Sequence, residues 1–100
     1  MSVIVIGRIT VDPANVERLF RDRSADFEAV AAAAKAVGAT HHQWAFAASE
    51  VVFIDEWPSA ESFNQFFESQ TKIGELMQAG GVTGPPTFEI LESKLGPDTF

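Results

Sequence analysis

The amino-acid sequence predicts an α+β fold, in which helices cover one face of an antiparallel sheet. Two observations support this class. Strand-like and helix-like patterns follow one another in the order β-α-β-β-α-β, and the two middle strands read as a hairpin. The chain has 100 residues and is 46% hydrophobic, so we expect one globular domain spanning residues 1–100.

The first strand and helix have clear boundaries. Residues 2–11 are rich in β-branched residues, and alternate positions form one apolar row, which is Val3, Val5, Gly7, Ile9 and Val11. Asp12 and Pro13 are a typical cap residue and first-turn proline. Apolar residues at helical spacing then predict one long helix from about residue 13 to Val37, with Gly38 after its end.

The span HHQWAFAASEVVFIDEW predicts a hairpin with strands 40–47 and 50–57 and a two-residue turn between them. In that register the cross-strand partners are Phe46 with Val51, Trp44 with Phe53, His42 with Asp55, and Thr40 with Trp57. The other face holds Ala45, Ala47, Val52 and Ile54, which suit packing beneath helices. We therefore expect the aromatic face to be free of helices and to be covered by a second subunit.

A second helical segment and a last strand complete the chain. Pro58 and Ser59 stop the hairpin and cap a helix, which Gly74 can divide in two. Its apolar stripe consists of Phe63, Phe66, Phe67, Ile73, Leu76 and Met77. Residues 87–95 read as the last strand. The whole order is the split β-α-β arrangement of a ferredoxin-like fold, with both helical segments on one face.

Composition disfavours several classes of function. The formal net charge of −7 repels phosphate backbones and anionic lipids, so we expect no nucleic-acid partner and no membrane partner. The absence of cysteine removes disulfides, thiolate nucleophiles and cysteine-based metal sites. The first residues do not read as a signal peptide, which makes a cytoplasmic location the default. A chain of this size gains considerably from burial in a homodimer.

His42 and Asp55 are the candidate catalytic pair. An imidazole titrates near neutral pH and can act as a general base, and Asp55 opposite can fix its tautomer. The other interpretation is a structural polar pair at the rim. His41 points to the opposite strand face, so the two histidines cannot hold one metal ion and we expect no metal site. Arg8 can stabilise an oxyanion, or form a structural bridge with Asp55 or Glu92.

Aromatic residues supply the candidate substrate-binding surface. Trp44, Phe46, Phe53 and Trp57 can stack on a flat aromatic substrate, or can serve only as core or interface. On the second helical segment, Phe63 and Phe66 read as packing residues and Phe67 as a residue that lines a cavity.

The run VVFIDEWPSAESFNQFFES, with the order of elements and the later GPPTFEILES, resembles antibiotic biosynthesis monooxygenase-like proteins of the dimeric α+β barrel superfamily. The resemblance covers nearly the whole chain. It implies a homodimer whose sheets close face to face, and a pocket between sheet and helices in which Trp57 matches a tryptophan position. Members of that family include cofactor-independent oxygenases of anthrones and quinols, and haem-degrading enzymes.

The resemblance does not extend to haem degradation. Haem-degrading relatives have an asparagine where Gly7 stands, and a histidine near the position of Gln70. The chain also has no tyrosine, so a mechanism that needs a phenol in the pocket does not apply.

The leading hypothesis is a cofactor-independent monooxygenase that acts on a planar aromatic or quinol-type small molecule. His42, or Asp55 if His42 faces elsewhere, removes a substrate proton, and Arg8 stabilises the developing oxyanion. The alternatives are a non-catalytic dimeric binding or stress-related protein, and an isomerase or cyclase on the same scaffold.

Overall fold

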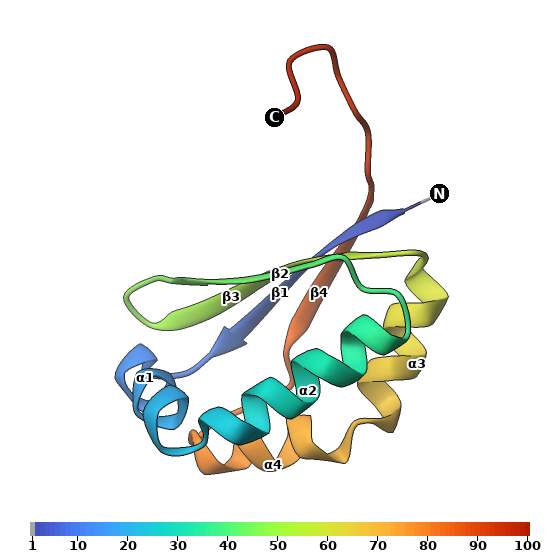
Figure 1. Ribbon diagram of the computed structural model, residues 1–100. Helices are drawn as coiled ribbons and strands as arrows, with labels where there is room; N and C mark the ends of the chain where they lie inside the picture. The colour runs from blue at the N-terminus through green and yellow to red at the C-terminus, as the bar shows by residue number, and fades with distance from the viewer. Residues whose placement is uncertain (1) are drawn as a thin grey trace.

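A four-stranded antiparallel sheet with helices packed on one face makes up the fold in the computed structural model, which describes residues 2–100 (Figure 1). The elements in chain order are β1 (Val3–Thr10), α1 (Pro13–Asp22), α2 (Ser24–Ala36), β2 (His41–Phe46), β3 (Glu50–Trp57), α3 (Ala60–Ser69), α4 (Thr71–Ala79) and β4 (Thr87–Glu92). The strands are ordered β2-β3-β1-β4, and all neighbours are antiparallel. The predicted α+β, ferredoxin-like fold is therefore confirmed.

The prediction of one long helix from residue 13 to Val37 is wrong in one respect, because this segment forms two helices. Asp12 caps α1 by accepting a hydrogen bond from the Ala14 N–H, as predicted. Arg23 has φ −127° and ψ 31°, outside the helical region, and separates α1 from α2. The Arg23 side chain holds Asp26 at 2.6 Å, and Asp26 also pairs with Lys72 of α4 at 3.1 Å. These ion pairs connect the break between α1 and α2 to α4.

The second helical segment is also divided, although not at Gly74. Gln70 has φ −88° and ψ 92°, an extended conformation, and lies between α3 and α4. Gly74 lies inside α4. Ser59 begins α3 through a capping box, in which the Ser59 side chain accepts from the Ser62 N–H and the Ser62 hydroxyl accepts from the Ser59 N–H.

The hairpin has the predicted register. Phe46 pairs with Val51, Trp44 with Phe53, and His42 with Asp55. The Ala47 N–H donates to the Glu50 carbonyl and closes the turn. Thr40 lies just before β2, and its N–H donates to the Glu56 carbonyl, which extends the ladder toward Trp57.

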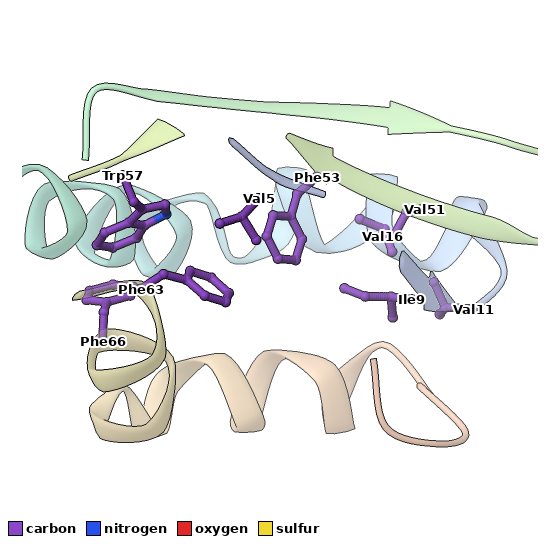
Figure 2. Packing of buried hydrophobic residues seen from close by; sticks show 9 residues of the cluster. All are labelled: Val5, Ile9, Val11, Val16, Val51, Phe53, Trp57, Phe63 and Phe66. Carbon is purple, nitrogen blue, oxygen red and sulfur yellow. The ribbon is translucent and has the colours of Figure 1, made fainter. Parts of the chain in front are cut away.

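The face of the sheet that the helices cover was predicted wrongly. They cover the aromatic face: Trp57 is 1% exposed and Phe53 is 7% exposed, and both lie in the core (Figure 2). The core cluster comprises Val5, Ile9, Val11, Val16, Val51, Phe53, Trp57, Phe63 and Phe66. The reason is the pairing of β3 with β1, which puts both apolar rows on one face: Val3 lies opposite Trp57, Val5 opposite Asp55, Gly7 opposite Phe53 and Ile9 opposite Val51. Helices cover the more apolar face of the sheet.

Gly7 makes room for this arrangement. A Cβ atom at Gly7 would lie only 2.1 Å from a ring carbon of Phe53. The Phe53 ring therefore lies directly against the β1 backbone.

The opposite face of the sheet has no helix over it (Figure 1). It carries a group of aliphatic residues beside polar ones such as Gln43, Glu56 and Glu89. By strand alternation and register it presents Ile4, Ile6, Val52, Ile54 and Leu91. Arg8 lies on this face and pairs with Glu50 at 3.1 Å. We call these five aliphatic residues the open face.

Within residues 2–100, none of the helices is both long and apolar enough to cross a membrane.

Candidate active site

A cavity of about 600 Å³ lies between the aromatic face of the sheet and the helices. This volume is in the range of small-molecule pockets, about 300–1000 Å³. Its lining comes from β1, β2, β3, α2, α3, α4 and the segment before β2. The lining residues are Ile9, Phe27, Val30, Ala31, Ala34, Lys35, Ala39, Thr40, His41, His42, Trp44, Phe53, Asp55, Trp57, Phe63, Phe66, Phe67, Ile73, Leu76 and Met77.

The cavity owes its volume to the short side chains of α2. The helix contains the run AVAAAA, and Ala31 and Ala34 line the cavity together with Val30. No residue of α2 is buried, although the helix lies over the sheet. Methyl groups are too short to fill the space down to the aromatic rings of β2 and β3. A leucine-rich helix in the same place would have closed it.

Asp55 and His42 form the polar centre of the cavity lining. The His42 Nδ1 lies 2.5 Å from Asp55 Oδ1, and the Trp57 Nε1–H donates to Asp55 Oδ2 at 3.1 Å. Asp55 is 7% exposed, whereas the His42 side chain is 43% exposed. Because the ionised carboxylate can only accept, it selects the tautomer with the proton on Nδ1. The His42 Nε2 of a neutral ring is then free to accept a proton.

Aromatic rings surround this pair. The Trp44 ring meets His42 edge-on with a centroid distance of 5.2 Å, and meets Phe53 at 6.0 Å. Phe67 lines the cavity from α3 and packs edge-on against Phe88 of β4 at 4.9 Å. The wall is thus apolar on several sides, while the His42 side chain remains 43% exposed.

The structure brings together six of the eight predicted site residues. His42, Asp55, Trp44, Phe53, Trp57 and Phe67 all line the cavity. Phe46 does not line it: this residue is 40% exposed near the hairpin turn, where its ring stacks on Phe20 of α1 at 5.9 Å.

Arg8 lies on the other side of the sheet. Its guanidinium pairs with Glu50 rather than with Asp55 or Glu92, which were the predicted bridging partners. The backbone of β1 separates it from the cavity, so it cannot reach a ligand held beside His42 in the same chain. The predicted oxyanion role of Arg8 finds no support in this geometry.

Glu56 forms a polar cluster that is separate from the pair in the cavity. It lies opposite His41 in the hairpin and accepts hydrogen bonds from the hydroxyls of Thr40, Ser2 and Ser93. The Thr40 hydrogen bond, followed by that from Ser2, lowers the pKa of Glu56 below its usual value. No group of three histidine, aspartate or glutamate side chains that could hold a metal occurs among residues 2–100.

The part that α2 plays in the cavity was not foreseen from the sequence, although a pocket between sheet and helices was expected. Phe27, Val30 and Ala34 were read only as apolar positions of one long helix, and Ala31 was not singled out. The four consecutive alanines from Ala31 to Ala34 were the available signal, because a helix that covers a sheet normally presents larger side chains to it.

Comparison with known proteins places the fold. No protein-family model and no curated protein sequence matches the chain. Solved structures do match, and one is the cofactor-independent oxygenase SnoaB from Streptomyces nogalater, with 16% identity, 98% of each chain covered and a TM-score of 0.64. Another is Rv0793 from Mycobacterium tuberculosis, with 18% identity, 98% of this chain and 100% of that chain covered, and a TM-score of 0.64. A third, named antibiotic biosynthesis monooxygenase, has 11% identity, 93% and 99% coverage, and a TM-score of 0.63. At these identities the similarity shows a shared fold, and it agrees with the family resemblance seen in the sequence.

Proposed function

We propose that this protein is a cofactor-independent monooxygenase that acts on a planar aromatic or quinol-type molecule. The observation that carries the proposal is the His42–Asp55 pair at the wall of an apolar, ring-lined cavity. A base oriented by a buried carboxylate is suited to removing a proton, and aromatic walls are suited to a flat substrate. SnoaB, which has the same fold, is named a cofactor-independent oxygenase.

The reaction begins with proton abstraction. The Nε2 atom of neutral His42 takes a proton from an acidic O–H, or from a C–H next to a carbonyl group, and Asp55 stabilises the resulting imidazolium. The substrate anion is electron-rich and transfers electrons to O2, after which a carbon–oxygen bond forms and gives a peroxide. His42 returns its proton to the peroxide. Loss of water then leaves one oxygen atom on the substrate as a carbonyl, so that both atoms of O2 are accounted for.

The developing negative charge is balanced within the cavity. Because Arg8 lies on the other face of the sheet, we assign the charge balance to the His42 imidazolium rather than to Arg8. The surrounding rings of Trp44, Phe53 and Trp57 keep water from the anion before O2 reacts with it.

Oxygen uptake by metal-free protein tests the proposal. With an anthrone or quinol as substrate and a chelator present, we expect uptake, and we expect His42→Ala to lower kcat at least about 100-fold, in line with general-base catalysis. Arg8→Ala is the control and should retain the activity. Uptake that survives His42→Ala unchanged, or binding of the substrate with no uptake by the wild type, would contradict the proposal.

We also infer that residues 1–100 act as one domain and that two copies form a homodimer through the open face. Its five aliphatic residues are contiguous across β1, β3 and β4, and contiguous apolar surface of this kind marks an interaction site. Leu91 is 47% exposed, and Leu95 just after β4 is 86% exposed. In a two-fold dimer the same patch of each subunit meets its copy, so the aliphatic residues of one open face cover those of the other.

A further inference from the structure

The cavity is polar at one end and apolar at the other. The polar side chains at the polar end are those of Lys35, His42 and Asp55, which come from the end of α2, the start of β2 and the adjoining part of β3. Thr40 and His41 also border the cavity, but the Thr40 hydroxyl donates to Glu56, and His41 lies on the other strand face. Phe27 lines the cavity near the start of α2, eight residues before Lys35, and helical rise puts these two positions about 12 Å apart. Met77 and Leu76 of α4 line the cavity as well. Both residues also line a second, smaller apolar pocket, together with Phe27 and Trp44.

Lys35 is a positive charge at the polar end. Among residues 2–100, Arg8, Arg23, Lys72 and Lys94 each form an ion pair, whereas Lys35, Arg18 and Arg21 form none. Of these three unpaired residues, Lys35 is the one that lines the cavity. The buried carboxylate of the cavity, Asp55, is already held by His42 and Trp57. The Lys35 amine therefore has no carboxylate partner within the described residues, although the chain has a net charge of −7, and it can pair with an anionic group of a ligand.

We propose that the ligand carries an acidic group, such as a carboxylate, which pairs with Lys35 at the His42 end of the cavity. This inference rests on the proposed function, because it assumes that a planar aromatic molecule occupies the cavity. The acid fixes the orientation of the ring system: the apolar part extends toward Phe27 and Met77, and the ring carbon nearest the acid lies beside the His42 imidazole. Lys35 is then a specificity-determining residue, and it takes no part in the proton transfer.

The test compares two probes of one shape. Anthracene-2-carboxylate and 2-(hydroxymethyl)anthracene have the same rings and differ in charge, and their binding can be followed by quenching of Trp44 and Trp57 fluorescence. We expect the wild type to bind the carboxylate about five- to tenfold more tightly, the size of one charge-assisted hydrogen bond at a partly solvated site. Lys35→Gln should remove this preference and leave the Kd of the alcohol unchanged. Added salt should weaken binding of the carboxylate alone.

Lys94→Gln is the matched control, because Lys94 pairs with Glu92 after β4 and does not line the cavity. It should leave both Kd values unchanged. Equal binding of the two probes by the wild type, or a preference that persists in Lys35→Gln, would overturn the inference and leave the proposed function standing. If neither probe binds, the result would instead contradict the proposed function as well as this inference, because both require a cavity that binds aromatic molecules.

Discussion

Asp55 is the residue on which the site depends, because it holds two other side chains in place. It accepts hydrogen bonds from the His42 ring and from the Trp57 indole N–H, and it is buried. The pairing of His42 with Asp55 could be predicted from the alternation of the hairpin and the position of its turn. The Trp57 hydrogen bond was not foreseen, because it depends on how the Trp57 indole packs against Phe63 and Phe66 of α3.

Substitutions at Asp55 separate its two roles. Asp55→Asn keeps the shape of the side chain, but its amide N–H can donate to His42 Nδ1 and so favour the tautomer with the proton on Nε2. That tautomer cannot accept the substrate proton at Nε2, so kcat should fall at least about 100-fold with little change in KM. Asp55→Ala leaves the buried Trp57 N–H without a partner and should lower the free energy of unfolding by about 1–3 kcal/mol, measured by urea denaturation. Asp98→Ala, at an exposed position, should change neither quantity. Full activity in Asp55→Asn would rule out the orienting role.

Helix α2 determines the cavity at the level of elements. Its bulk is small where it faces the rings of β2 and β3, so the layer of helices does not fill the space above the sheet. A cavity forms where side chains are too small to fill the space between elements, and the sequence alone gives only weak evidence of where this occurs. The helix break at Arg23 escaped prediction, and the break in the second helical segment was placed at Gly74 instead of Gln70, because neither Arg23 nor Gln70 is a helix-breaking residue.

Filling the cavity from α2 should abolish binding without unfolding the protein. Ala34→Leu adds a side chain that projects into the space and buries additional apolar surface, so we expect it to raise the free energy of unfolding by about 1–2 kcal/mol. Binding of anthracene probes should weaken at least about tenfold, as measured by titration. Ala32→Leu, on the exposed side of the same helix, is the control and should leave binding unchanged. Unaltered binding in Ala34→Leu would mean that the ligand lies elsewhere.

The Asp26 cluster should make the packing of α2 on α4 sensitive to acid. The Arg23 hydrogen bond, together with that from Lys72, lowers the pKa of Asp26 below its usual value of 3.8. A carboxyl group whose pKa is lower in the folded state than in the unfolded state adds stability above the unfolded value, and this stability is lost as the pH falls through the folded value. Asp26→Asn should therefore lower the Tm at pH 7, and the difference from wild type should shrink below about pH 4. A Tm difference that does not vary with pH would contradict this.

The two faces of the sheet differ in what covers them. The aromatic face is covered by the helices of the same chain, and the other face, which carries the five aliphatic residues, has no helix over it (Figure 1). The sequence predicted the aromatic pairs correctly and assigned them to the wrong side, because the hairpin was considered without its neighbour β1. Once Gly7 and Val5 are placed opposite Phe53 and Asp55, the apolar rows of both strands belong together. The Ile4 and Ile6 row of β1 then remains with Val52 and Ile54.

The inferred homodimer depends on that open face. Ile54→Asp introduces a charge at its centre, which should convert a dimer of about twice 10.9 kDa into a monomer in light scattering. Far-UV circular dichroism should show that the fold is retained. Glu89→Gln, near the edge of the same face, is the control and should remain dimeric. A monomeric wild type at micromolar concentration would contradict the inference.

The location of the bound ligand tests the central claim most directly, namely that the cavity beneath α2 is the site. Nuclear Overhauser effects between the ring protons of anthracene-2-carboxylate and the methyl groups of the protein can distinguish the two apolar faces. We predict contacts to the methyl groups of Ala31, Ala34 and Ile73, which line the cavity. Contacts to Ile6, Ile54 and Leu91 instead would place the ligand on the open face and would contradict the account.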